Sequence, residues 1–291
     1  MTDSPAAPAL IASYYTLTGA PVGQPPRFSF EERVSAAARA GFAGIGLLGD
    51  DYATLRASGH SDADLLGVLD RHGVRILEIE FLFDWALDGR RGDVARAAEA
   101  TLQTMVEVFA PHHMNVGDLQ APGEGAPMEV IAERFAGICD RAAARGTRVA
   151  LEFLPWTRLG DLATALEVVH TAARPNGGVL IDAWHYFRGR PDPDTLRGLS
   201  AHEVVAVQLD DAAPGVVGPL FEDTMLRRRL PGDGAFDLIE LVQTLDAIGV
   251  DVPYSVEVMS TVEQSLPVDD AARRAHDAAV RVLARARSGA R

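Results

Sequence analysis

Four polar residues stand where apolar, β-rich runs end in the second half of the chain. Each has strong hydrophobes beside it, so the alternation of side chains along a strand can point it into a shared interior. The four residues are Glu152, Asp182, Gln208 and Glu257. Three carboxylates that converge without cationic partners repel one another, and burying unpaired charges is costly. A divalent cation resolves this conflict, and oxygen ligands suit Mg²⁺ or Mn²⁺. We therefore predict one divalent metal ion bound by these four residues.

Each of these residues also has a simpler interpretation. Glu152 or Glu257 could cap a neighbouring helix or pair with an arginine, Asp182 could only start a helix, and Gln208 could satisfy loop backbone groups. Four such coincidences at the ends of four successive strands favour the metal site over the simpler interpretations. None of the four predicted ligands is a Cys or a His, the residues that usually bind structural zinc, which argues against a structural zinc site.

Two further residues could line the same site. A histidine taken alone is more often structural, but His185 follows Asp182 by three residues, which favours a functional role. Trp85 and Trp156 are residues of a type usually found in a core. Because Trp156 follows Glu152 closely, it could instead form a pocket wall.

Short β-rich apolar runs alternate with amphipathic, Ala-rich helical patterns along the chain. The predicted strands are Ala9–Tyr14, Ala43–Leu48, Arg75–Phe81, His113–Val116, Arg148–Phe153, Gly178–Ile181, Val204–Leu209 and Tyr254–Val258. The predicted helices are Phe30–Ala40, Asp62–Arg71, Asp93–Phe109, Met128–Ala144, Asp161–Ala173, Asp194–Leu199, Asp237–Ile248 and Asp269–Ala286. Eight alternating units predict parallel strands with helical crossovers, closed into one (β/α)8 TIM barrel. We expect a single domain over residues 1–291 with short flexible ends.

Helix boundaries carry the expected end signals. Ser29 precedes Phe30, and Glu32 follows three residues after Ser29, which is a capping-box pattern. Glycines stand just past four predicted helix ends, at Gly41, Gly73, Gly146 and Gly249. No Gly-x-Gly-x-x-Gly follows a strand, so a dinucleotide-binding fold has little support.

The longest stretches without periodicity all follow predicted strands. They are Thr16–Arg27, Asp118–Pro127 and Asp210–Asp233. In a barrel of this kind, segments after strands lie over the mouth where active sites are found.

The composition excludes several classes of chemistry. The chain has 291 residues, near the ~250 typical of such barrels. Its net charge of −14 repels nucleic-acid phosphates and anionic membrane surfaces. The sequence contains no Lys, so Schiff-base catalysis by a lysine and a P-loop are both excluded.

One cysteine, Cys139, falls in a predicted helix, where we expect a small buried hydrophobe. A lone cysteine cannot form an internal disulfide, which fits a reducing compartment. The N-terminus has no basic-then-apolar signal pattern, and no apolar run reaches the ~18 residues of a membrane span. We predict a cytoplasmic protein.

Five stretches of the second half resemble the xylose-isomerase-like barrels. They are Leu151-Glu152-Phe153-Leu154-Pro155-Trp156, Ile181-Asp182-Ala183-Trp184-His185, Val207-Gln208-Leu209-Asp210-Asp211-Ala212, Arg228-Arg229-Leu230-Pro231-Gly232-Asp233-Gly234 and Val256-Glu257-Val258. That superfamily includes sugar isomerases and epimerases, inosose isomerases and dehydratases, 3-dehydroshikimate dehydratases and the endonuclease IV type of DNA-repair nuclease. The resemblance covers nearly the whole chain by element order and is specific in the second half.

The resemblance implies roles for individual residues. Epimerases of the superfamily hold one metal with a Glu, Asp, His, Glu set, and Gln208 stands here in place of that His. Its 3-dehydroshikimate dehydratases resemble the present chain in that Gln and in a Trp after the first Glu, here Trp156. The resemblance also implies that Glu152 and Glu257 act as acid and base. It further implies that His185 and an arginine near Pro231 hold substrate oxygens, and Arg228 has the matching spacing.

The chemistry expected of this site is abstraction of a proton next to a carbonyl, through a metal-stabilised enediolate. Returning the proton to the other face gives epimerisation, and returning it to the adjacent carbon gives isomerisation. Loss of a β-hydroxyl gives dehydration. The ligand set does not separate these outcomes.

The first functional hypothesis is an isomerase or epimerase of a sugar or inositol-like keto-polyol. The alternative is a lyase of the 3-dehydroshikimate or inosose dehydratase type, or one that cleaves a 3-keto-glycoside. A repair nuclease would need more metals, more His ligands and a basic groove, and the net charge of −14 argues against it. The intact carboxylates argue against a barrel that only binds.

We expect Mn²⁺ or Mg²⁺, with Co²⁺ as an alternative, and no organic cofactor. The expected partner is a small polyhydroxy keto substrate, with no nucleic acid and no membrane. The oligomeric state stays open between a monomer and a homo-oligomer.

Overall fold

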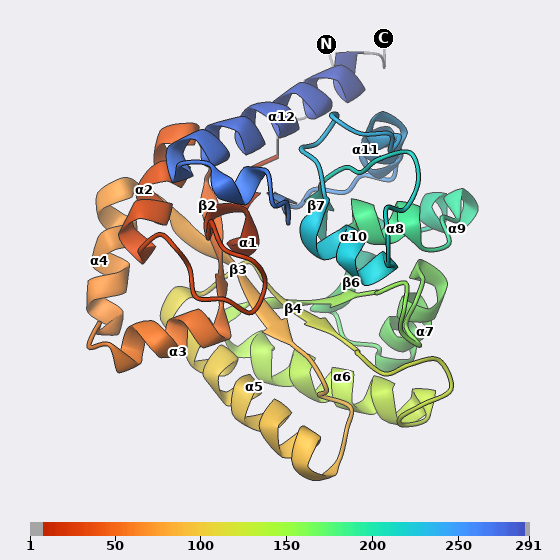
Figure 1. Ribbon diagram of the computed structural model, residues 1–291. Helices are drawn as coiled ribbons and strands as arrows, with labels where there is room; N and C mark the ends of the chain where they lie inside the picture. Colours follow the sequence, from red (N-terminus) through yellow and green to blue (C-terminus); the bar gives the residue numbers. More distant parts are fainter. Residues whose placement is uncertain (1–7, 289–291) are drawn as a thin grey trace, which may run out of the picture.

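The computed structural model describes residues 8–288, and eight parallel strands form its closed barrel (Figure 1). The strands are β1 (Leu10–Ala12), β2 (Gly44–Leu48), β3 (Arg75–Leu82), β4 (His113–Gly117), β5 (Arg148–Glu152), β6 (Gly177–Asp182), β7 (Val204–Leu209) and β8 (Tyr254–Val256). Each strand pairs with the one before it, and β1 closes the ring by pairing with β8, with Ile11 opposite Ser255. The predicted fold class is confirmed.

The predicted strands all exist, with shifts at their ends. The two outermost predictions were too long, because β1 stops at Ala12 and β8 stops at Val256. Tyr14 already begins a short helix, and Glu257 follows β8 directly. Most strand residues are buried, as expected where helices cover the outside of a parallel sheet.

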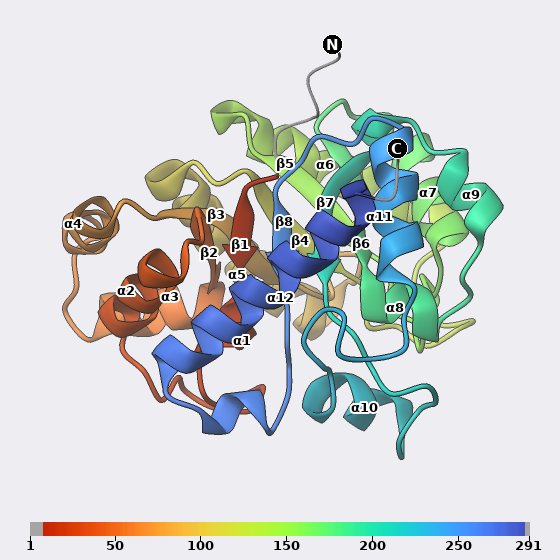
Figure 2. The ribbon, with the colours of Figure 1, turned by 90° about the horizontal axis from the view of Figure 1, so that it is seen from above.

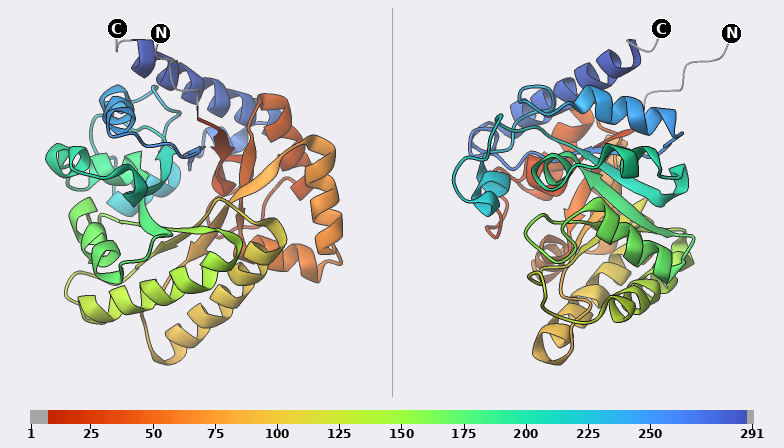
Figure 3. Two further views of the ribbon diagram at one scale, coloured as in Figure 1. Left: turned by 180° about the vertical axis from the view of Figure 1, so that it is seen from behind. Right: turned by 90° about the vertical axis from the view of Figure 1, so that its right-hand side faces the viewer.

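The eight predicted helices surround the barrel (Figure 3). They are α2 (Phe30–Ala40), α4 (Asp62–His72), α5 (Gly89–Phe109), α6 (Met128–Ala142), α7 (Leu162–Ala172), α9 (Pro193–Arg197), α11 (Leu238–Ala247) and α12 (Val268–Ser288). Helix α5 begins four residues earlier than the predicted Asp93. Cys139 on α6 and Trp85 are buried, as predicted for a helix core position and a core tryptophan.

Four short helices were not predicted. They are α1 (Tyr14–Leu17), α3 (Gly49–Ala57), α8 (Ala183–Arg188) and α10 (Leu220–Leu226). Each spans nine residues or fewer and lies after a strand end, so it shows too few turns for a helical period to stand out. Helix α10 follows β7 and lies at one end of the barrel, at the lower edge of Figure 2.

The predicted helix signals act as expected. The Ser29 hydroxyl accepts a hydrogen bond from the backbone N–H of Glu32, and the Glu32 carboxylate accepts one from the backbone N–H of Ser29 at 2.8 Å. Gly41 and Gly73 end α2 and α4 with φ values of 101° and 64°. Side chains with a Cβ rarely adopt this left-handed conformation, which explains glycine at both positions.

Within residues 8–288, no helix combines the length and the apolar character that crossing a bilayer requires. The prediction of short flexible ends concerns residues that lie outside the described range 8–288.

Candidate functional site

The four predicted metal ligands lie at the same end of the barrel. Glu152 and Asp182 are the last residues of β5 and β6, Gln208 is next to last in β7, and Glu257 follows β8. All four are buried. Because the strands are parallel and in register, with Asp182 opposite Gln208, their C-terminal ends bring these side chains to one layer.

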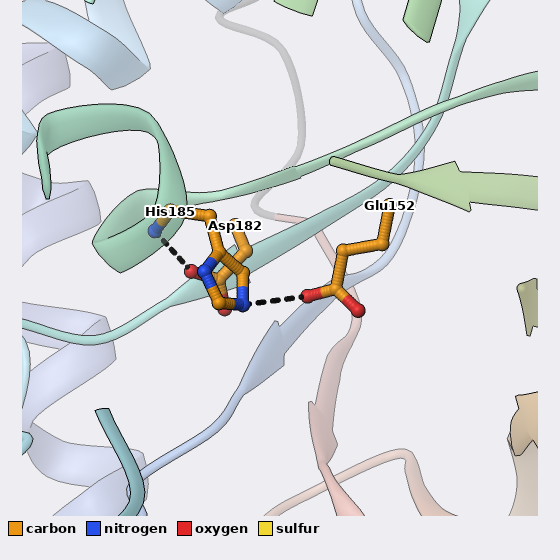
Figure 4. A group of neighbouring side chains, drawn as sticks. All are labelled: Glu152, Asp182 and His185. Atoms are coloured by element: carbon orange, nitrogen blue, oxygen red, sulfur yellow. Dashed lines mark hydrogen bonds and ion pairs between the residues drawn. The ribbon is translucent and has the colours of Figure 1, made fainter. Parts of the chain in front are cut away.

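Three side chains form a compact group with metal-ligand chemistry: Glu152, Asp182 and His185 (Figure 4). One ligand atom from each lies within 4.8 Å of the others. The His185 Nε2 atom is 3.2 Å from Glu152 Oε1. Asp182 Oδ1 accepts a hydrogen bond of 2.8 Å from the backbone N–H of His185, so Asp182 also caps α8. The simpler interpretation of Asp182 and the functional one are therefore compatible.

Arg228 occupies the centre of the carboxylate group. Its Nη1 atom donates to Asp182 Oδ2 at 2.7 Å and to Glu257 Oε2 at 3.1 Å, and it also contacts Asp210. Its Nη2 atom donates to Thr224 Oγ1 at 2.8 Å. The prediction had assumed that the carboxylates lack a cationic partner, and this premise is wrong. The reason is that α10 and the residues after it fold back over the barrel mouth and insert the guanidinium.

One guanidinium does not balance this group. Four carboxylates (Glu152, Asp182, Asp210 and Glu257) against one arginine leave a formal charge of −4 + 1 = −3 if all are ionised. Burial, together with the negative charge of Asp182, raises the pKa of Glu152 well above its usual value. Burial also raises the pKa of Glu257 to about 8, although Arg228 opposes that shift.

The donor atoms fit a hard divalent cation. Beside the carboxylate oxygens, the Gln208 Oε1 atom is buried and has no hydrogen-bond partner among the described residues. An orphaned amide oxygen next to excess negative charge is a position that a cation would satisfy. That Glu152, Asp182, Gln208 and Glu257 are the ligands stays a prediction.

Burial lowers the pKa of His185 to about 4, so the ring is neutral near pH 7. Its Nδ1 atom has no partner within residues 8–288. A neutral imidazole can donate or accept a hydrogen bond, or bind a metal. The expectation that His185 contacts substrate and not metal remains a prediction.

A cavity of about 340 Å³ opens at this end of the barrel. Glu152, Glu257, His185, Arg228 and Trp156 all line it, so every predicted catalytic and substrate-binding residue faces one space. Asp182 and Gln208 are not among the lining residues, and both are almost fully buried. The predicted wall residue Trp156 packs against His185, with ring centroids 5.4 Å apart.

The sequence reasoning missed Glu80, which also lines the cavity. Its Oε1 atom accepts hydrogen bonds from Ser13 Oγ (3.1 Å) and from the backbone N–H of Tyr14 (3.2 Å). The Ser13 hydroxyl also lies 3.0 Å from Glu257 Oε1 and so connects the two glutamates. The alternation of Glu78 and Glu80 within an apolar strand was the available signal, because two such residues share one face.

Similar proteins include enzymes of two kinds. A 3-dehydroshikimate dehydratase of Pseudomonas aeruginosa is 28% identical over 239 residues, which cover 81% of this chain and 37% of that protein. An inosose isomerase of Bacillus subtilis is 27% identical over 150 residues, which cover 51% of this chain and 53% of that protein. This chain thus spans little more than a third of the first relative and about half of the second.

The fold is also that of a solved structure, the IolI protein with a bound zinc atom. The two superpose with a TM-score of 0.81 at 19% identity, over 95% of this chain and 98% of the other. The family model described as xylose isomerase-like TIM barrel matches residues 34–284. With a closed barrel of eight parallel strands and most of its length matched, the chain belongs to the xylose isomerase-like TIM barrel family.

Proposed function

We propose that the chain is a divalent-metal-dependent isomerase or epimerase that acts on a sugar or inositol-like keto-polyol by removing a proton next to the carbonyl. The observation that carries this proposal is the pair Glu152 and Glu257, two buried carboxyl groups that line one cavity. They come from β5 and from the end of β8, three positions apart in the ring, so they reach the cavity from different sides.

The pair suits proton transfer at neutral pH. A general acid or base works best when its pKa is near the working pH, and burial raises the pKa of both groups toward that range. One carboxylate takes the α-proton, and the electron pair of the broken C–H bond moves toward the carbonyl oxygen. The other carboxyl returns a proton to the opposite face or to the adjacent carbon.

Glu152, Asp182, Gln208 and Glu257 would hold the metal through carboxylate and amide oxygens. When bound, such an ion supplies Lewis-acid stabilisation of the negative charge that develops on the substrate oxygens. The oxygen donors favour Mn²⁺ or Mg²⁺, and the similar IolI protein was solved with zinc. A bound metal would take over part of the charge that Arg228 now meets at Asp182 and Glu257, and Arg228 could then donate to substrate oxygens, with His185 holding another.

A dehydratase is the second candidate, and one comparison favours it. The similar protein that covers 81% of this chain is a 3-dehydroshikimate dehydratase. Dehydration begins with the same proton removal and then needs an acid near the leaving hydroxyl. Burial keeps His185 neutral, so the protonated carboxyl of Glu152, whose pKa burial raises, would supply that proton, with His185 beside it at 3.2 Å.

We further propose a small polyhydroxy keto substrate rather than nucleic acid, since the chain has a net charge of −14 and the cavity is lined with carboxyl groups. A single domain over residues 1–291 and a cytoplasmic location remain part of this proposal.

The test is turnover in D₂O with added Mn²⁺ or Mg²⁺, on inososes, keto-sugars and 3-dehydroshikimate. We expect deuterium at the α-carbon of the substrate or product by NMR or mass spectrometry. A product formed without any break in an α-carbon–hydrogen bond would overturn the proposal.

A further inference from the structure

We propose that the substrate of this site carries an apolar, flat group attached to its keto-polyol part. The inference rests on the proposed function and extends it to the class of substrate. It comes from the uneven division of the 340 Å³ cavity into a polar floor and an apolar outer wall.

The floor carries the chemistry. Glu80, Glu152, His185, Arg228 and Glu257 line it, and all five are buried. The side chains of Glu80, Glu152 and Glu257 come from strand ends or the residue after one, and His185 lies just after β6. Arg228 follows α10, but its guanidinium reaches the same carboxylates, so the hydrogen-bonding atoms lie at the inner end of the cavity. Space for a hydroxylated ring is therefore found at this end.

The outer wall is mainly apolar and partly aromatic. Phe81 and Phe83 stack on each other at the end of β3, with ring centroids 4.2 Å apart and planes 21° apart. Across the mouth, Phe221 of α10 packs edge-on against Trp156, with centroids 5.6 Å apart. Strands β3 and β7 are four positions apart in a ring of eight, so the segments that follow them face each other over the cavity.

The exposure of this wall sets it apart from the rest of the surface. Within residues 8–288, Phe83 and Phe221 are the two aromatic residues in the exposed class, at 37% and 54%, and both line this cavity. Leu119, at 40% exposed, lines it too. Exposed apolar surface that gathers around a polar site marks a ligand or partner contact. Asp50, Thr101 and Thr224 are polar exceptions in the lining.

A bare keto-polyol does not match this wall. Hydroxyl groups on every edge of the ring would lose water against Phe83 and Phe221 without gaining a hydrogen bond, which costs free energy. An aromatic substituent would instead pack against these rings in offset or edge-on geometry. The arrangement selects a substrate with hydroxyls at one end and an aromatic group at the other.

The test compares two probes that do not react, phenyl β-D-glucopyranoside and methyl β-D-glucopyranoside, titrated against the full chain with Mn²⁺. We expect the phenyl probe to bind about tenfold more tightly or better, by calorimetry. Phe83→Ala and Phe221→Ala should each reduce this ratio several-fold. The matched control is Val280→Ala on α12, which removes a 44% exposed apolar side chain that does not line the cavity, and it should leave the ratio unchanged.

Equal affinity for the two probes would overturn the inference. So would a second outcome, in which both Phe variants keep the preference for the phenyl probe and unfold at the same temperature as the parent chain. Proton exchange in D₂O is followed separately, with two keto probes: 2-keto-myo-inositol and the 3-keto derivative of the phenyl glucoside. Exchange without a phenyl preference overturns this inference and leaves the proposed function standing. A phenyl preference that the Phe variants lose, without exchange on any keto probe, supports the aromatic wall and counts against the proposed function.

Discussion

Two acidic clusters lie inside the barrel, and they differ in how their charge is balanced. In the deeper one, Glu78 Oε2 lies 3.0 Å from His113 Nε2 and accepts a hydrogen bond of 2.7 Å from Ser255 Oγ. Burial alone would raise the pKa of Glu78, but the hydrogen bond and charge of His113, together with side-chain interactions with Glu80 and Ser255, outweigh it, and the pKa falls to about 2. At the mouth, three carboxylates share the single guanidinium of Arg228. Burial raises the pKa values of Glu152, Asp210 and Glu257 there, although the charge of Arg228 opposes the rise.

The difference supports the proposal that the cluster at the mouth is functional and the deeper cluster is structural. The Oε2 atom of Glu78 has partners within the fold in His113 and Ser255, which lower the pKa of Glu78, while its Oε1 atom has no hydrogen-bond partner among the described residues. The carboxylates at the mouth remain short of positive charge, which is a cost to the folded chain that a bound cation would offset. Unbalanced buried charge next to a cavity is therefore the better indicator of a site than buried charge alone.

The largest expected effect is on turnover. Glu152→Gln and Glu257→Gln each remove one of the two proposed proton-transfer groups from the mouth cluster, and we expect each to lower the rate of α-proton exchange by about 10²–10⁴-fold. Glu129→Gln on the outer surface of α6 is the control and should keep full activity. Unchanged exchange rates in both mouth variants would remove these residues from the mechanism.

The next prediction concerns stability without metal. Arg228→Met leaves Asp182, Asp210 and Glu257 without their shared cation, and we expect a loss of about 3–5 kcal/mol in the free energy of unfolding, measured by urea with EDTA present. Mn²⁺ should restore part of the loss.

His113→Leu, which breaks the deeper pair, is the matched comparison. It should lower stability to a similar extent but show no such rescue by Mn²⁺. Equal responses of the two variants to Mn²⁺ would contradict the distinction between the clusters.

The two clusters should also respond to pH with opposite signs. For Glu257 the folded-state pKa of about 8 is above the usual 4.5. Between these pH values the folded chain binds one more proton than the unfolded chain, so the free energy of unfolding falls as pH rises from 4.5 to 8. For Glu78 the folded-state pKa of about 2 is lower than 4.5, so its contribution is present above pH 4.5 and is lost as pH falls.

For each proton, the free energy of unfolding should change by about 1.4 kcal/mol per pH unit within these ranges. Unfolding at several pH values with EDTA measures it, using Glu257→Gln and Glu78→Gln to assign each slope. Because burial also raises the pKa values of Glu152 and Asp210, part of the fall should remain in Glu257→Gln. A metal-free chain whose stability does not fall between pH 5 and 8, or whose fall is as steep in Glu257→Gln as in the parent chain, would refute the assignment.

The smallest expected effect concerns the identity of the metal. Gln208→His replaces the orphaned amide oxygen by an imidazole nitrogen, which should shift preference toward Zn²⁺ over Mg²⁺ by about tenfold. Competition titrations on the parent chain and the variant measure this shift. An unchanged preference would show that residue 208 does not contact the ion.

Much of the fold could be predicted from local patterns. The alternation of apolar runs and helical periods identified all eight strands and eight helices, and the Ser29–Glu32 and Gly41 signals marked helix ends correctly. The short helices α1, α3, α8 and α10 were missed, because four to nine residues give no clear period. Helix α10 lies within Asp210–Asp233, a stretch that was predicted to follow a strand and lie over the barrel mouth, without a helix.

The sequence by itself determined which residues reach the mouth. Glu152, Asp182, Gln208 and Glu257 stand at strand ends, and in a closed parallel barrel every strand end meets the same layer. Only the tertiary structure decided what each side chain meets there. Arg228 enters the carboxylates from a segment that closes back over the barrel, and Glu80 joins them through Ser13 from strands far apart in the chain. Such contacts depend on barrel closure and side-chain rotamers, which residue spacing does not encode.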